Sequence, residues 1–166
     1  KHNKQVPILT ASTIHAKSPK NEYGKTKREV EVLIENYSKN KNTKCFIYRL
    51  PHVFGKGCKP NYNSIISTWI YNSIHNLEIN CFDRDIKMHY VYVQDIVDEF
   101  LSIIKKKDSQ DICIEPKKVY EITLGEVVDI INEFKQNVES RNYKPKGSDF
   151  KKKLFETYLD YCSNAS

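Results

Sequence analysis

The chain has 166 residues, of which 29% are charged and 39% are hydrophobic, and its length fits one domain. This composition is typical of a folded globular protein and argues against a disordered one. No apolar run approaches the roughly 20 residues that a bilayer-spanning helix needs, and this excludes a helical membrane protein. The chain begins at Lys1 and not at a methionine, so we expect a piece of a longer protein.

Positive charge is concentrated in the first half of the chain. Residues 1–83 carry 13 basic and 6 acidic side chains, a net charge of +7, whereas residues 84–166 carry 14 and 15, a net charge of −1. This asymmetry favours an anionic partner in the first half, such as the phosphates of a nucleotide, a nucleic acid or an acidic surface. The alternative is a lysine-rich composition with no binding role, because 23 lysines stand against four arginines.

The five cysteines are odd in number and show neither a CxxC motif nor another zinc-ligand spacing. We therefore expect no metal site. No secretory signal opens the chain, which favours reduced thiols and a cytoplasmic location.

Strands alternate with helices along the chain. Strands are predicted at 6–10, 45–49, 77–79, 89–93 and 119–122, the first two of them buried, and helices at 23–37, 63–74, 95–106, 124–134 and 150–159. In the first helix the apolar residues Val30, Leu33, Ile34 and Tyr37 form one face, which we expect to be buried. The motif Thr123-Leu-Gly-Glu126 predicts a capping box. The alternation favours an α/β fold with a parallel sheet.

Tyr23 and Lys27 stand four residues apart at the start of a predicted helix, so their side chains share one face. A lysine ammonium beside a phenol stabilises the phenolate, which allows the tyrosine to exchange a proton with a substrate oxygen. The spacing alone is weak evidence, because Tyr37 and Lys41 repeat it at a helix end where we expect no function.

The surroundings of Tyr23 distinguish it from Tyr37. A predicted strand with the hydroxyl residues Thr10, Ser12 and Thr13 comes shortly before Tyr23. Open α/β sheets bind ligands where strands end and helices begin. A hydroxyl at this place could bond the same substrate oxygen as Tyr23.

Together these motifs resemble the NAD-dependent epimerase/dehydratase family of extended short-chain dehydrogenase/reductases. The resemblance covers about residues 6–135 and includes Tyr23-x-x-x-Lys27, Arg49-Leu-Pro-His-Val-Phe-Gly55 and Tyr90-Val-Tyr-Val-Gln-Asp95. Residues 48–64 and 119–131 look most like capsular-polysaccharide reductases of the CapF kind. The resemblance implies a Rossmann-like fold, with this chain holding the second half of a doubly wound parallel sheet and the substrate-binding elements.

The resemblance also implies roles for four residues at the cofactor. Tyr23 would be the general acid, while Lys27 would stabilise its phenolate and hold the nicotinamide ribose. Leu50 and Pro51 would lie near the nicotinamide ring. The cofactor would be NADH or NADPH.

The catalytic hydroxyl stays open between three residues. The pattern Ala11-Ser-Thr-Ile-His-Ala16 resembles a Ser-Ser-Ser-Ile-Gln-Ala stretch, and one register places Ala11 at the expected serine. We take Ser12 as the first choice and Thr10 and Thr13 as the reserves.

The remaining candidates are polar side chains that would contact the substrate: Thr13, His52, Lys59, Asn61, Asn63 and Arg84. His52 falls where the family usually has an asparagine, although an imidazole can also donate a hydrogen bond. Asp83-Arg84-Asp85 is also consistent with a simple charged turn.

The implied activity is the NAD(P)H-dependent reduction or epimerisation of a 4-keto nucleotide sugar, of the UDP-2-acetamido-2,6-dideoxy-hexos-4-ulose type. The five glycines cannot supply the glycine-rich turn that cradles a dinucleotide, so we expect the first half of the Rossmann sheet, with that turn, before Lys1.

We predict a reductase part at 1–138 followed by a polar linker and a C-terminal helix at 139–166. We further expect a homodimer, a cupin domain after Ser166, and neither nucleic-acid nor membrane partners. The alternative is a non-catalytic chain, or a basic module that binds nucleic acid or phosphate.

Overall fold

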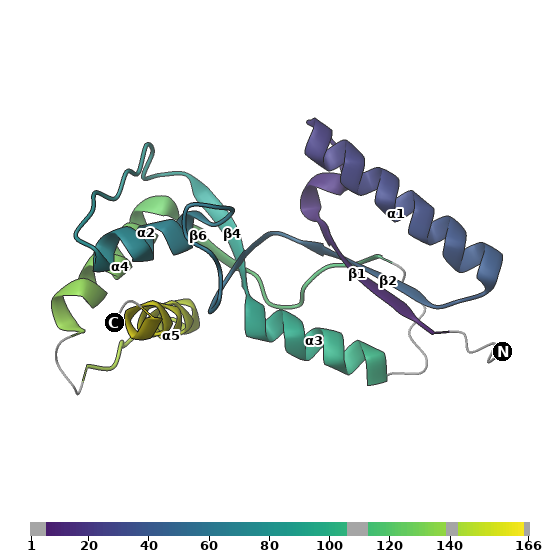
Figure 1. Ribbon diagram of the computed structural model, residues 1–166. Coiled ribbons are helices and arrows are strands. Elements are labelled where there is room, and N and C mark those ends of the chain that lie inside the picture. Colours follow the sequence, from purple (N-terminus) through teal and green to yellow (C-terminus); the bar gives the residue numbers. More distant parts are fainter. Residues whose placement is uncertain (1–5, 106–112, 139–142, 165–166) are drawn as a thin grey trace. The chain divides into compact units, whose positions relative to one another are not determined.

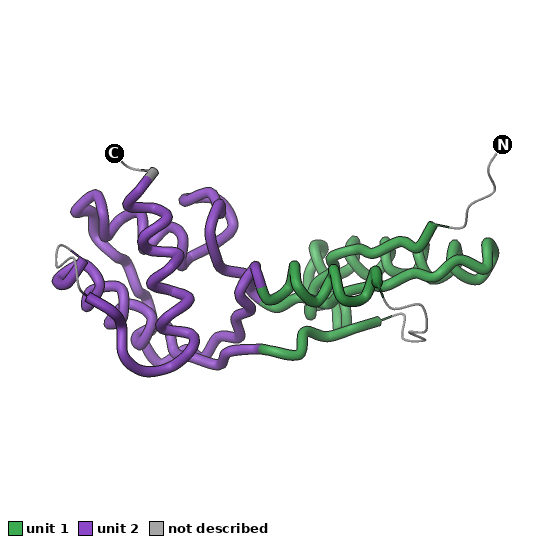
Figure 2. Tube along the Cα trace, turned by 90° about the horizontal axis from the view of Figure 1, so that it is seen from below, with its two compact units in different colours: residues 1–51, 95–118 green, residues 52–94, 119–166 purple. Residues whose placement is uncertain are grey.

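Two units make up the chain, and each is built from two separate stretches of sequence (Figure 2). Unit 1 comprises residues 1–51 and 95–118, and unit 2 comprises residues 52–94 and 119–166. The computed structural model describes residues 6–105, 113–138 and 143–164. Within these ranges, no helix combines the length and the apolar character that crossing a membrane requires.

Unit 1 contains a three-stranded parallel sheet with the strand order β1-β2-β5 (Figure 1). Its elements are β1 (Ile8–Thr13), the 3-10 helix η1 (Ile14–Ala16), α1 (Glu22–Lys41), β2 (Cys45–Leu50), α3 (Val93–Lys105) and β5 (Cys113–Ile114). The last residues of β1 and β2, Thr13 and Leu50, are partners in the register. The two strands therefore end side by side, at the edge of the sheet from which the chain passes through η1 towards α1.

The two faces of this sheet carry different helices, because side chains alternate along a strand. Tyr48 on β2 meets Phe100 on α3 with ring centroids 4.7 Å apart. The next residue, Arg49, bonds Glu31 on α1. Figure 1 accordingly shows α1 and α3 on opposite sides of β1 and β2.

Unit 2 holds a second three-stranded sheet and three helices. Its elements are β3 (His52–Phe54), α2 (Ile65–Ile74), β4 (Lys87–Tyr92), β6 (Tyr120–Thr123), α4 (Leu124–Asn137) and α5 (Asp149–Asn164). The strand order is β3-β4-β6, with β3 parallel and β6 antiparallel to β4. A core of buried side chains joins all these elements, with Trp69 from α2, Phe134 from α4 and Leu154 from α5 among them.

Most predicted helices and strands are present. The differences concern one short strand, the division into sheets and the place of the last helix. The strand predicted at 77–79 is wrong: this stretch is irregular, and Leu77 is 53% exposed. The predicted parallel sheet is present as β1-β2-β5, and a second, mixed sheet, β3-β4-β6, lies in unit 2. The linker predicted from residue 139 lies partly outside the described residues. The helix after it is present as α5, but it belongs to the core of unit 2 and is not separate from the part before residue 138.

Helix α1 does not bury the apolar face that the sequence predicts to be buried. Leu33 is 68% exposed, and Val30 and Tyr37 are also exposed. Its two buried residues are Gly24 and Glu31. Ile34, the fourth residue of the predicted face, is half-buried. Most of the apolar face of α1 is therefore turned to solvent, and its most deeply buried side chain is a carboxylate.

Candidate active site

Tyr23 and Lys27 lie on the first turns of α1, as predicted. The side chain of Asn21 caps the helix by accepting a hydrogen bond from the backbone N–H of Gly24 at 2.8 Å. Lys27 Nζ lies 6.0 Å from the centroid of the Tyr23 ring. Tyr23 is 55% exposed, so its phenol is accessible to a ligand.

Gly24 permits a close approach between the start of α1 and the segment after β1. A Cβ atom at this position would lie 2.9 Å from the carbonyl oxygen of His15 and 3.3 Å from Cα of Pro19. Any larger residue would push the helix start away from this segment. The glycine between Tyr23 and Lys27 thus helps to keep the pair close to the end of β1.

The three candidate hydroxyls at the end of β1 have different surroundings. Ser12 is buried, and its Oγ donates a hydrogen bond of 2.6 Å to Glu31 Oε1. Because this uses the only hydroxyl proton, Ser12 has none left to donate to a substrate oxygen. Thr13 is also buried, and its Oγ1 accepts from the backbone N–H of His15 at 3.3 Å, a role that leaves its own proton for another acceptor. Thr10 is half-buried, two residues before Ser12 on the same strand.

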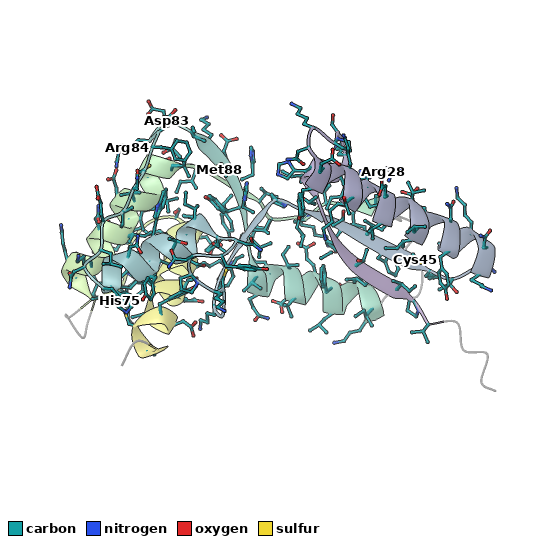
Figure 3. All side chains as sticks on the ribbon, turned by 45° about the horizontal axis from the view of Figure 1, so that its top comes forward. Arg28, Cys45, His75, Asp83, Arg84 and Met88 are labelled. Carbon is teal, nitrogen blue, oxygen red and sulfur yellow. The ribbon has the colours of Figure 1, made fainter. Side chains whose placement is uncertain are left out.

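Glu31 is buried and is the centre of an ion-pair cluster in unit 1, which also comprises Ser12, Arg28, Glu35 and Arg49. Arg49 donates from Nε to Glu31 Oε1 at 3.1 Å and from a terminal nitrogen to Oε2 at 2.7 Å. Arg28, labelled in Figure 3, donates to Glu31 Oε2 at 2.9 Å and to Glu35 at 2.7 Å. Burial raises the pKa of the Glu31 carboxyl, but the bonds from Arg49, Ser12 and Arg28 outweigh burial and lower the pKa to about 2.

The same cluster accounts for the one group of potential metal ligands among the described residues. Donor atoms of Glu31, Glu35 and Cys113 lie within 4.8 Å of one another. The two arginines already balance the carboxylate charges, so the arrangement is an ion-pair network in which a metal ion would compete with Arg28 and Arg49.

Leu50 and Pro51, the predicted nicotinamide contacts, follow directly on Arg49. Both are half-buried at the end of β2, where Leu50 is the register partner of Thr13. Unit 1 therefore brings together the ends of β1 and β2, with the start of α1 following β1 through η1.

The predicted substrate contacts other than Thr13 lie in unit 2. His52 is the exposed first residue of β3, with its ring 5.8 Å from that of Tyr90. Lys59, Asn61 and Asn63 are exposed on the loop before α2. The backbone N–H of Asn61 donates to the Thr68 hydroxyl at 3.0 Å, which ties this loop to α2.

Arg84 is engaged within unit 2. Its guanidinium donates to both carboxylate oxygens of Asp129 on α4, at 2.8 and 2.7 Å, and to the carbonyl of Gly125 at 3.3 Å. Figure 3 shows Arg84 next to Asp83 at the turn. These contacts agree with the charged-turn interpretation, and a nucleotide phosphate would have to compete with Asp129 for Arg84.

Comparison with known proteins decides the family. The model of the "NAD dependent epimerase/dehydratase family" matches residues 2–122. This chain belongs to that family. UDP-glucose 4-epimerase from Thermotoga maritima has the same fold: it superposes with a TM-score of 0.78 over 97% of this chain and 65% of its own, at 16% identity.

Two proteins of higher identity match nearly the whole chain. The capsular polysaccharide assembling protein CapF from Staphylococcus aureus is 36% identical, with a TM-score of 0.88, over 100% of this chain and 46% of its own. UDP-2-acetamido-2,6-beta-L-arabino-hexul-4-ose reductase from Pseudomonas aeruginosa is 31% identical over 99% of this chain and 44% of its own. The chain thus spans less than half the length of these relatives, and the predicted Rossmann-like α/β fold is confirmed.

The residues of this epimerase/dehydratase chain fit one end of the family's cofactor. A phenol, an ammonium and the half-buried Leu50–Pro51 could hold a nicotinamide and its ribose. The sequence has no glycine-rich turn for the pyrophosphate, so the fit is confined to that end.

Sequence reasoning missed the cluster around Glu31, although two signals for it are present. Glu31 continues the four-residue spacing of Tyr23 and Lys27 along α1. Arg49 is the only charged residue in the buried strand β2 and therefore needs a partner.

Proposed function

We propose that this chain forms the proton-donating and substrate-binding part of an NAD(P)H-dependent reductase, or epimerase, that acts on a 4-keto nucleotide sugar. The substrate class is a UDP-2-acetamido-2,6-dideoxy-hexos-4-ulose, used in making deoxy sugars for a polysaccharide. The observation that carries the proposal is the Tyr23–Lys27 pair, on the helix that follows β1, whose end pairs with the end of β2. The identity to the Pseudomonas aeruginosa reductase supports the substrate class.

The chemistry follows from the roles of this chain's own side chains. When bound, NAD(P)H supplies the hydride that reduces C4 of the sugar. Tyr23 donates its phenolic proton to the keto oxygen, which becomes the new hydroxyl, and Lys27 stabilises the phenolate that remains. We assign the second hydrogen bond to the keto oxygen to Thr13 in place of Ser12, because the Ser12 proton is donated to Glu31.

The other residues of the proposal bind the two ligands. Leu50 and Pro51 contact the nicotinamide. His52, Lys59, Asn61 and Asn63 contact the sugar nucleotide, whose phosphates match the net positive charge of residues 1–83. Arg84 joins them only if it leaves Asp129. The cytoplasm is the proposed location, and the free cysteines among the described residues support it.

The test compares Tyr23→Phe with Tyr37→Phe in the longest natural polypeptide that contains residues 1–166. Both tyrosines lie on α1 and are exposed, and each precedes a lysine by four residues, so the two variants are matched. We expect Tyr23→Phe to abolish oxidation of NAD(P)H by the 4-keto-UDP-sugar and Tyr37→Phe to retain it. Turnover that survives Tyr23→Phe with the fold intact would refute the proposal.

The proposal includes a homodimer through the exposed apolar face of α1. Val30, Leu33 and Tyr37 follow one another at helical spacing on this face. Leu33→Lys should convert the dimer to a monomer in sedimentation experiments. The matched change Leu101→Lys, on the exposed side of α3, should leave the dimer intact. A wild-type protein that sediments as a monomer would contradict this part.

A further inference from the structure

Helix α1, which carries the proposed catalytic pair, places a charged side chain deepest against its sheet. Its apolar residues Val30, Leu33 and Tyr37 are exposed, whereas the residue most deeply buried against β1 and β2 is Glu31. The contacts of Glu31 therefore contribute to the position of α1, and such polar contacts are directional and fix geometry more narrowly than apolar ones.

The Glu31 carboxylate connects three elements of unit 1 at once. Its two oxygens accept four hydrogen bonds: one from Ser12 on β1, two from Arg49 on β2 and one from Arg28 on α1 itself. The Glu31 side chain is 1% exposed, so water does not weaken these bonds by competing for them.

Each anchored residue is adjacent to a residue of the proposed site. Ser12 precedes Thr13, and Arg49 precedes Leu50. Glu31 lies one helical turn after Lys27 and two turns after Tyr23, on the same face of α1.

We propose that Glu31 is a positioning residue, which sets the Tyr23–Lys27 pair in register with the ends of β1 and β2. This inference rests on the proposed function for its catalytic consequence. Glu31→Gln keeps one acceptor oxygen but puts an NH2 group, which cannot accept, in place of the other, so that the bonds to Arg49 and Arg28 cannot all form. Helix α1 then shifts along the sheet. A displacement of about 1 Å in a catalytic group costs about 100-fold in rate.

The test uses Glu31→Gln and the matched variant Glu133→Gln. Glu133 also lies on a helix, accepts two bonds from Lys151 at 2.7 and 2.6 Å and one from Tyr143 at 2.6 Å, but belongs to unit 2. We expect Glu31→Gln to lower kcat by roughly 10- to 100-fold. KM for the keto sugar should change little, because most proposed substrate contacts are in unit 2. Glu133→Gln should change neither.

A second readout needs neither substrate nor cofactor. In amide NMR spectra, Glu31→Gln should shift the signals of Thr13, Tyr23 and Leu50 together, and Glu133→Gln should not. If Glu31→Gln does not fold, Ser12→Ala removes only the link to β1 and should produce the same pattern more weakly. A folded Glu31→Gln with an unchanged kcat and unchanged signals overturns the inference. If Tyr23→Phe is fully active, the proposed function is refuted. The NMR signals alone then test whether Glu31 positions α1 against β1 and β2.

Discussion

The buried Glu31 carboxylate predicts a specific loss of stability in acid. The folded protein holds the pKa of Glu31 at about 2, against an ordinary value of 4.5. A carboxyl with a lowered pKa stabilises the fold fully above the unfolded-state value, and this contribution is lost as the pH falls from about 4.5 through about 2. Since one pKa unit corresponds to about 1.4 kcal/mol, the contribution is about 3 kcal/mol.

The assay must separate unit 1 from unit 2. Trp69 is the only tryptophan and lies in the core of unit 2, so its fluorescence reports the unfolding of that unit. Ile47 on β2 is fully buried in unit 1, and its methyl NMR signal reports the other unit. Urea titrations at stepped pH values then give a free energy of unfolding for each unit.

The difference between the wild type and Glu31→Gln isolates the carboxyl, because glutamine does not titrate. At pH 7 the variant should be less stable in unit 1, and the two proteins should converge as the pH approaches 2. The Trp69 transition should show no such convergence. If the stability gap at Ile47 were the same at pH 7 and pH 2.5, the ion-pair cluster would not be the source of the stability, and the reasoning would be refuted.

Three further predictions concern unit 2 and use tryptophan fluorescence in urea. Gly55→Ala should lower the free energy of unfolding by about 1–3 kcal/mol, because Gly55 has φ +144° and an added Cβ would lie 2.3 Å from Val93 Cγ1. Gly57→Ala should lower it less, because a Cβ added there would meet no atom within 4 Å. Equal losses of stability in the two variants would contradict the steric argument. Thr123→Ala removes the capping box of α4 and should cost about 1 kcal/mol, so an unchanged midpoint would show that the cap is dispensable. Leu154→Ala opens a cavity in the core and should cost about 2–5 kcal/mol; a loss below about 1 kcal/mol would mean that α5 does not pack there.

The sequence predicts the longer elements of this fold well because they carry periodic signals. Helix α4 has an apolar face and the capping box Thr123–Glu126, and both are present in the structure. Strands β3 and β5 were missed because three and two residues are too few to show a period. Leu77–Ile79 was mistaken for a strand, since a short apolar run has the same pattern in an irregular segment.

Only part of the candidate site could be predicted from the sequence, because some of its contacts are local and others join distant elements. Tyr23 and Lys27 are close in sequence, so helical geometry alone places them together. The bonds of Ser12 and Arg49 to Glu31 join three elements, and no local pattern encodes such contacts. In α1 the apolar periodicity predicts the buried face at Leu33, but Leu33 is exposed and the buried residue is Glu31, whose charge is balanced by the ion-pair cluster.

The interleaving of the two units constrains the order in which the chain can fold. The polypeptide passes from one unit to the other three times, after residues 51, 94 and 118. Strand β2 pairs with β5 through Ile47 and Cys113, so the first stretch of unit 2 is contained in the loop that this pairing closes. During synthesis, β1, α1 and β2 leave the ribosome long before β5. Until residue 113 emerges, one edge of β2 has no strand to pair with, and that is when the nascent chain is most exposed to aggregation.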